Sequence, residues 1–209
     1  MNDILKGYAA AATPALIERY EAFDPAALYA PVLDLLPRAP GRVADIGAGT
    51  GRDAAWFVRQ GHAVLAVEPV QPLREAGLAR HGDVGIVFLD DDLPHLARVR
   101  DHGLFDLVTL NGVWHHLDAP ARAVALPVLA NMLRPGGRLV FALRHGPGAP
   151  GRPAFRLSDE ETIDAAARCD LTLLRSRKAE SHQAGNRALG VDWTWMVFEW
   201  SGVRSRPLP

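Results

Sequence analysis

The stretch from Arg42 to Arg52, RVADIGAGTGR, constrains the fold of this chain more than any other part of it. Its apolar run Val43–Ile46 is typical of a buried strand, and residues 53–59 have the pattern of a helix. Three glycines stand between them at alternate positions: Gly47, Gly49 and Gly51. Glycines let a backbone approach a ligand closely, and the N-terminus of a helix offers free N–H groups. The stretch therefore predicts an α/β fold with a nucleotide-binding turn.

The spacing of these glycines does not fit a dinucleotide site, which requires glycines at the first, third and sixth places. Counted from Gly47, the sixth place is Arg52, and the third glycine comes one residue early. The pattern Asp-x-Gly-x-Gly-x-Gly instead resembles the first motif of class I S-adenosylmethionine-dependent methyltransferases. This resemblance implies that the following residues contact the cofactor: Asp45, Gly47, Ala48, Gly49 and Gly51.

The overall composition narrows the classes of partner. A length of 209 residues favours one domain. The formal net charge of −1 and the absence of a basic run argue against nucleic acid and membrane partners. Cys169 is the only cysteine, so a disulfide and a cysteine-based metal site are excluded. The N-terminus lacks the pattern of a secretion signal and no apolar run reaches membrane-spanning length, so we expect a cytoplasmic protein.

Acidic residues follow the next two predicted strands, at the edge where open α/β sheets bind ligands. Glu68 ends the strand Ala63–Val67. The resemblance implies that it accepts bonds from both ribose hydroxyls, whereas the alternative is a surface glutamate in a turn. Asp90 and Asp91 follow the strand Gly85–Leu89, where the family commonly has an acidic residue that binds the adenine amino group. Both aspartates remain candidates for this contact. The alternative is that they lie in a solvated turn or cap a helix. No calcium-loop pattern supports a metal, and we expect none. Two neighbours complete the expected cofactor site: Pro69 and Leu73.

A second motif lies between Phe105 and Leu117, FDLVTLNGVWHHL. A buried strand over 107–110 runs into it, and the whole closely resembles the fourth-strand motif of the family. The resemblance implies that Asn111 contacts the cofactor and that the residues just after it face the reacting centre: Trp114, His115 and His116. Because adjacent residues on a helix point in different directions, at most one histidine is expected to face the substrate.

The remaining chain is expected to form the acceptor side of the site. Residues 133–139, LRPGGRL, resemble the family's turn into the fifth strand. Arg144 and His145 emerge at the ligand end of that strand, and Arg187 lies in an expected loop over 181–190 that borders the pocket. The last strand, 191–200, is rich in tryptophan, for which packing at the sheet edge is favoured over ligand stacking.

Residues 1–36 have a helical pattern, with Pro14 opening one helix and Asp24 capping another. One interpretation is a helix pair packed on the sheet. The other is a lid over the cofactor in which Tyr20 contacts the ligand, and Tyr29 would cover the same mouth.

The resemblance implies a Rossmann-like three-layer sandwich with a seven-stranded, mostly parallel sheet and an antiparallel last strand. We expect one domain over 1–209 in three parts. Residues 1–38 are an N-terminal helical lid, 39–145 the cofactor-binding core, and 146–209 a C-terminal helix with an antiparallel strand pair.

The implied function is methyl transfer from S-adenosylmethionine to a small-molecule acceptor, at oxygen or nitrogen rather than carbon, with S-adenosylhomocysteine as product. Three histidines are candidate general bases because imidazole titrates near neutral pH: His115, His116 and His145. The candidate acceptor-binding residues are Trp114, Arg144 and Arg187. The alternatives are a non-catalytic S-adenosylmethionine-binding protein and an RNA or protein methyltransferase. The chain is expected to be a monomer or a homodimer.

Overall fold

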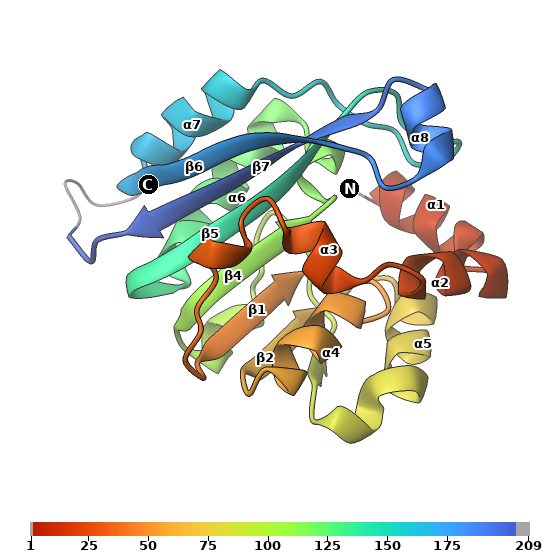
Figure 1. Ribbon diagram of the computed structural model, residues 1–209, viewed down its shortest axis with the longest axis horizontal. Coiled ribbons are helices and arrows are strands. Elements are labelled where there is room, and N and C mark those ends of the chain that lie inside the picture. The colour runs from red at the N-terminus through yellow and green to blue at the C-terminus, as the bar shows by residue number, and fades with distance from the viewer. Residues whose placement is uncertain (1, 204–209) are drawn as a thin grey trace.

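The computed structural model, which describes residues 2–203, is built around one seven-stranded sheet with strand order β3-β2-β1-β4-β5-β7-β6 (Figure 1). The strands are β1 (Arg42–Ile46), β2 (Ala63–Val67), β3 (Val87–Leu89), β4 (Phe105–Asn111), β5 (Leu133–His145), β6 (Leu171–Glu180) and β7 (Asp192–Trp200). The first five are mutually parallel, and β7 runs antiparallel to both β5 and β6. The expected mostly parallel sheet with an antiparallel last strand is confirmed.

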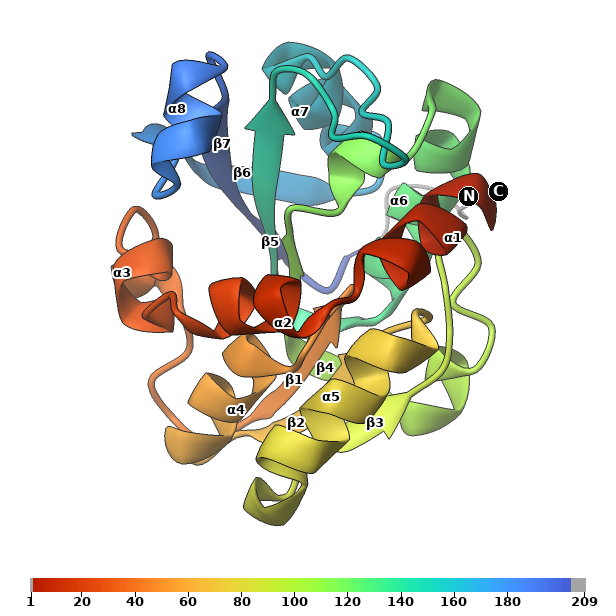
Figure 2. The same ribbon diagram turned by 90° about the vertical axis from the view of Figure 1, so that its right-hand side faces the viewer.

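Helices cover both faces of the sheet, so that helices, sheet and helices form the expected three layers (Figure 2). They are α1 (Asn2–Ala11), α2 (Pro14–Glu21), α3 (Pro25–Tyr29), α4 (Arg52–Arg59), α5 (Gln71–His81), α6 (Ala119–Asn131), α7 (Asp159–Ala167) and α8 (Ala184–Ala188). Four 3₁₀ turns lie between them among the described residues: η1 (Leu33–Leu35), η2 (Gly82–Val84), η3 (Val99–His102) and η4 (Trp114–His116). Within residues 2–203, no helix is long and apolar enough to span a membrane.

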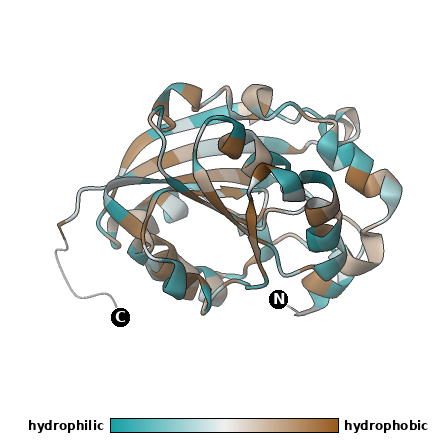
Figure 3. Cartoon of the chain, turned by 90° about the horizontal axis from the view of Figure 1, so that it is seen from below, coloured by the Kyte–Doolittle hydropathy of each residue, from teal (hydrophilic) through white to brown (hydrophobic). Residues whose placement is uncertain are grey.

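Alternation along the strands produces two cores, one on each face of the sheet. In β1, Val43 packs with α3 and α4, whereas the next residue, Ala44, packs with α6 and α7. This follows from the two-residue period of a strand, which sends successive side chains to opposite faces. Viewed from below, hydrophobic residues concentrate along the strands while the helices carry hydrophilic stretches outward (Figure 3).

The N-terminal helices begin where the sequence predicts. Thr13 caps α2 through a bond that its Oγ1 accepts from Leu16 N at 3.3 Å, and Asp24 caps α3 by accepting from Ala26 N at 3.0 Å. Tyr29, which was expected over the mouth of the site, lies instead fully buried in the core, with its ring 4.9 Å from that of Trp195. The chain turns inward there because α3 packs on α4 rather than over the strand ends.

Three elements differ from their expected bounds. The strand β5 starts at Leu133, inside the stretch that was expected to form the turn into it, and pairs with β4 across a register shift. The expected loop over 181–190 contains the short helix α8. The segment Trp114–His116 forms one 3₁₀ turn rather than an α-helix, which changes where its side chains point.

The contact of α5 with the glycine turn yields a stability prediction. A Cβ added at Gly77 would stand 2.7 Å from the carbonyl oxygen of Thr50 and 2.7 Å from Phe88 Cζ. Gly77→Ala should therefore push α5 from the turn and destabilise the protein by roughly 1–3 kcal/mol. Gly82→Ala is the matched control, since Gly82 has φ −64° and no atom within 4 Å of an added Cβ. Thermal unfolding midpoints should fall for the first variant only; equal midpoints would contradict this packing.

Candidate cofactor and acceptor site

A cavity of about 580 Å³ lies at the carboxyl ends of the parallel strands. Its walls come from the glycine turn after β1, the ends of β2, β4 and β5, the helices α1 and α2, and the segment from the end of β6 to β7. Figure 2 shows α1 and α2 crossing in front of the strand ends. Cavities of this size and composition suit small molecules.

The glycine turn presents bare backbone to this cavity. Gly49 has φ +59°, a conformation that favours glycine, and an added Cβ there would meet no atom within 4 Å. A side chain at this position would therefore project into open space in the cavity wall. Gly51 was expected to contact the cofactor but is absent from the wall. Its added Cβ would stand 2.6 Å from Phe88 Cζ, so its role is close packing against β3.

Glu68 joins the end of β2 to the glycine turn. Its Oε2 accepts a bond from Gly49 N at 2.7 Å, and its Oε1 accepts one from Val70 N at 2.8 Å. The side chain is only 4% exposed, so the alternative of a surface glutamate is wrong. Burial raises the pKa of Glu68 to about 7, although both backbone N–H groups favour its charged form.

Asp45 carries an unpaired oxygen at the floor of the cavity. Its Oδ1 accepts a bond from Thr109 Oγ1 at 3.0 Å, whereas Oδ2 is buried without a hydrogen-bond partner. Burial and the neighbouring charge of Asp53 raise the pKa of Asp45 to about 7. Asp53 itself accepts from Arg52 Nε at 2.7 Å and from Asn111 Nδ2 at 3.0 Å. An uncompensated carboxylate of this kind is suited to a cationic ligand group.

The three aspartates that follow β3 have different surroundings. Asp90 is absent from the wall and pairs with Arg74 at 3.3 Å on the surface, so its expected contact with adenine is wrong. Asp91 lines the cavity, but its carboxylate accepts from the backbone N–H groups of Arg98 and Val99, at 2.7 and 3.0 Å. It therefore serves as the turn cap considered above. Asp92, which was not singled out, also lines the cavity, and burial together with Asp91 raises its pKa.

The 3₁₀ turn after β4 reverses the expected roles of its residues. Trp114 is 2% exposed and absent from the cavity wall, with its ring 4.9 Å from that of Phe141 in the core. The expectation that it faces the acceptor is thus wrong. His115 and His116 both line the cavity, with ring centroids 4.0 Å apart, so the expectation of only one is also wrong. The tight turn brings the two rings together, tilted by 42° to each other, instead of separating them.

His116 connects three segments that are distant in sequence. Its Nδ1 lies 2.8 Å from the carbonyl oxygen of Pro153, and because a carbonyl only accepts, Nδ1 carries the proton. Its Nε2 lies 2.8 Å from the hydroxyl of Tyr8 in α1. Burial lowers the pKa of His116, so the ring is neutral and Nε2 accepts the bond from Tyr8. Sequence reasoning missed Tyr8, although its spacing of four from Ile4 places both on one helix face.

His115 stays neutral as well. Burial, followed by the charges of His116 and Arg144, lowers the pKa of His115 to about 2. Its Nδ1 is buried without a hydrogen-bond partner. A ring held in this way is a poor proton acceptor and instead forms a polar part of the wall.

Two other expected residues lie outside the wall. His145 Nε2 stands 3.1 Å from both Asp159 Oδ1 and Thr194 Oγ1, because His145 and Arg144 are adjacent on a strand and point to opposite faces. Arg187 turns back on its own segment and donates to the carbonyl oxygen of Ser181 at 2.6 Å. The expected roles of both in the site are therefore wrong.

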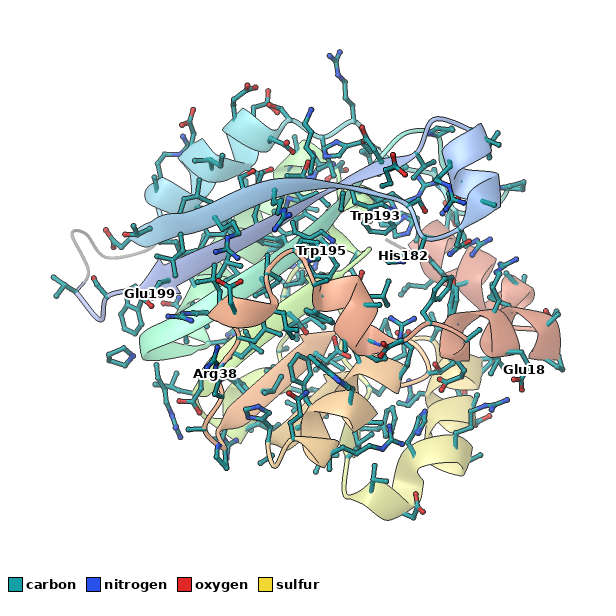
Figure 4. The ribbon with its side chains drawn as sticks, in the orientation of Figure 1. Glu18, Arg38, His182, Trp193, Trp195 and Glu199 are labelled. Atoms are coloured by element: carbon teal, nitrogen blue, oxygen red, sulfur yellow. The ribbon has the colours of Figure 1, made fainter. Side chains whose placement is uncertain are left out.

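The other predicted residues do line the cavity: Tyr20, Gly47, Ala48, Pro69, Leu73, Asn111 and Arg144. Trp193 and Trp195 line it too, contrary to the favoured packing at a sheet edge, because β7 lies inside the sheet and starts at the ligand end. Figure 4 labels both tryptophans and His182, which lie between α3 and α8. Among residues 2–203, no group of three or more histidine, cysteine or acidic side chains could hold a metal ion.

Comparison with known proteins finds similarity to methyltransferases. A family model described as a methyltransferase domain matches residues 44–141. An uncharacterized methyltransferase of Mycobacterium tuberculosis is 38% identical over 106 residues, which cover 50% of this chain and 40% of that relative. The 1,6-didemethyltoxoflavin-N1-methyltransferase of Burkholderia thailandensis, solved with its namesake ligand and S-adenosylhomocysteine, is similar at TM-score 0.64 and 28% identity. That match covers 85% of this chain and 76% of the other.

In residues 44–141 and in its fold, the chain is similar to class I S-adenosylmethionine-dependent methyltransferases. The magnesium protoporphyrin IX methyltransferase of Synechocystis shares its fold at TM-score 0.65, with 15% identity and coverage of 85% of this chain and 78% of that one. The resemblance of the two sequence motifs to this class is confirmed. The curated relatives are longer, since the matched stretch spans less than half of the mycobacterial methyltransferase.

The raised pKa of Asp45 gives a pH-dependent prediction for the stability of the protein. A carboxyl whose pKa rises on folding holds a proton that the unfolded chain releases, so it costs stability as pH rises from about 4 to about 7. Asp45→Asn should remove this cost while its amide oxygen still accepts from Thr109. The variant's thermal midpoint should come closest to that of the parent near pH 4, and its advantage should grow to at least about 2–4 °C, on the order of 1 kcal/mol or more, at pH 8.

Asp34→Asn is the control for this experiment, because Asp34 is exposed and its bond with Arg175 lowers its pKa. Asp34→Asn should not raise the thermal midpoint at pH 8. A gain of the same size for both variants, or none for Asp45→Asn, would show that Asp45 is not held at an unfavourable charge.

Proposed function

We propose that this protein transfers a methyl group from S-adenosylmethionine to a small-molecule acceptor that shares the cavity with the cofactor. The observation that carries the proposal is the set of groups around one cavity: the open backbone at Gly49, the carboxylate of Glu68, and the unpaired oxygen of Asp45. These fit a ligand with ribose hydroxyls and a cationic end.

The proposed cofactor contacts follow from the hydrogen bonds that each group has left to make. Each oxygen of Glu68 accepts one backbone bond and keeps capacity for another, so the carboxylate is oriented to accept two ribose hydroxyls. Asp45 Oδ2 is suited to the ammonium of the methionine part. Asp92 is the acidic side chain best suited to the adenine amino group, since the carboxylate of Asp91 is engaged by backbone N–H groups. Leu73 is buried and lines the cavity as an apolar contact for the base.

Methyl transfer requires the protein mainly to align the methyl donor with the acceptor. Bound S-adenosylmethionine supplies an already activated methyl group, so the protein positions the acceptor and excludes water. We assign the exclusion of water to α1 and α2, whose residues Leu5, Tyr8 and Tyr20 lie in the wall. This keeps the interpretation of residues 1–38 as a lid, with 39–145 as the cofactor-binding core and 146–209 as the C-terminal part.

A proton on the acceptor would leave through Tyr8 and His116. The hydroxyl of Tyr8 donates to His116 Nε2 at 2.8 Å, so Tyr8 can take a proton from the acceptor as it gives its own to the ring. The bond from Nδ1 to the carbonyl of Pro153 then stabilises the charged imidazole. A hydroxyl or amine acceptor needs this step, which agrees with oxygen or nitrogen as the methylated atom. The Burkholderia enzyme is named for methylation at a nitrogen, N1.

The cofactor site is tested by Gly49→Ala. The added methyl group would enter the space proposed for the cofactor, and the affinity for S-adenosylhomocysteine in isothermal titration should fall at least tenfold, about 1.4 kcal/mol. Gly85→Ala is the matched control, because Gly85 also has positive φ, +87°, and open space around an added Cβ, but lies outside the cavity wall. It should lose stability and keep its affinity. Equal affinities in the two variants would place the cofactor elsewhere.

The reaction is tested by release of S-adenosylhomocysteine from a library of small metabolites, run beside RNA and protein extracts. We expect turnover with a small molecule, and at least tenfold slower turnover in Tyr8→Phe at unchanged affinity for S-adenosylhomocysteine. Tyr8→Phe keeps the ring and removes only the hydroxyl. Turnover with macromolecules alone would overturn the small-molecule acceptor. Cofactor binding without turnover on any substrate would favour the non-catalytic alternative.

A further inference from the structure

Three arginines of the cavity wall form no ion pair: Arg19, which is exposed on α2, and Arg144 and Arg152, which are partly buried. Arg144, at the end of β5, and Arg152, in the loop after it, both line the wall. Among the described residues, the ion pairs of arginine involve other positions, such as Arg52 with Asp53 and Arg138 with Glu199. The carboxylates of the cavity come from β1, the start of α4 and the ends of β2, β3 and β6, and none of them forms an ion pair with Arg144 or Arg152.

The hydrogen bonds of the two arginines leave most of their donors free. Arg144 donates from Nη1 to the carbonyl oxygen of Pro147 at 2.6 Å. Arg152 donates from Nη1 to the hydroxyl of Tyr20 at 3.4 Å, and its Nε is buried with no hydrogen-bond partner. A guanidinium group has five N–H donors, so both have directed capacity to bind a further acceptor.

Burying these two positive charges without a negative partner also destabilises the protein. Burial lowers the pKa of Arg144, and the charge of Arg152 lowers it further. The guanidinium of Arg152 lies 5.1 Å above the ring of Tyr8, which offsets only part of this cost. The titratable groups facing the pair are Tyr8, Tyr20, His115 and His116, and each is neutral near pH 7 because burial disfavours its charged form. The charge of Glu68 also acts on Tyr8 and Tyr20, but its carboxylate accepts bonds from Gly49 N and Val70 N and forms no ion pair with either arginine.

We propose that Arg144 and Arg152 form a binding site for a carboxylate of the acceptor molecule, beside Tyr8. This inference rests on the proposed function and adds the acceptor's chemical class. The planar fork of a guanidinium group matches the two oxygens of a carboxylate, and such pairs are frequently bidentate. A single negative charge suits a wall that otherwise contains apolar and aromatic side chains such as Leu5, Phe23 and Trp193.

The position of this site links binding to the proton path. Arg152 directly precedes Pro153, whose carbonyl oxygen fixes the tautomer of His116. A carboxylate held by Arg152 would place the rest of the acceptor next to the hydroxyl of Tyr8, which lies under the same guanidinium. The methylated atom and the carboxylate would then be parts of one small molecule that spans from the cofactor to the arginines.

The test compares benzoate with benzamide, which share size and shape and differ in charge. Each is titrated by calorimetry into the protein saturated with S-adenosylhomocysteine, for the parent chain, Arg144→Gln and Arg152→Gln. Arg156→Gln is the matched control, since Arg156 lies on the same loop with an exposed side chain outside the wall. Phenyl phosphate is a further probe, and a titration of S-adenosylhomocysteine alone is run for every variant.

We expect the parent and Arg156→Gln to prefer benzoate over benzamide at least tenfold, and both cavity variants to lose that preference while keeping their affinity for S-adenosylhomocysteine. No preference in the parent, no change in the cavity variants, or tighter binding of phenyl phosphate than of benzoate would each overturn the carboxylate site. Failure of the parent to bind S-adenosylhomocysteine would instead contradict the proposed function, and the benzoate preference measured without it would still decide the carboxylate site.

Discussion

The site depends on one buried carboxylate that has two backbone partners. Glu68 stands where β2 ends and bonds to Gly49 in the turn after β1, so two parallel strands are joined at their ligand ends by a side chain. Its bond to Val70 also fixes the start of α5, which packs against the same turn through Gly77. The cost of burying this charge appears in its pKa of about 7, and the two N–H groups offset part of it. The wall proposed for the cofactor is therefore held together by contacts within the chain itself.

A second set of contacts assembles the acceptor side from segments distant in sequence. His116 in the turn after β4 holds α1 through Tyr8 and the loop after β5 through Pro153. Arg152 of that loop in turn reaches Tyr20 of α2. The N-terminal helices are thus fastened to the strand ends by polar contacts across the cavity, whereas α3 is fastened by apolar packing of Tyr29 in the core. The first two helices can belong to the site because they are not needed to cover the sheet.

The sequence predicted the fold and the proposed cofactor side of the cavity well, because both depend mainly on the conformation of the backbone. Glycine spacing, apolar runs and an acid at a strand end each predict local geometry, and Asp45, Gly49 and Glu68 line the cavity. The acceptor side was predicted less well. Trp114 and His145 were assigned from their neighbourhood in the sequence, but a 3₁₀ turn and strand alternation direct them away from the cavity.

Tyr8 and Arg152 could not have been found by the same reasoning. Neither belongs to a motif, and each reaches the cavity only through contacts over long sequence separations, such as the 108 residues between Tyr8 and His116. Such contacts also couple the movement of α1 to acidity. Burial lowers the pKa of His116 while Tyr8 covers it, and departure of α1 would expose the ring and restore its ordinary basicity. Proton uptake and opening of the cavity are therefore thermodynamically linked, and acid shifts the population toward the uncovered form.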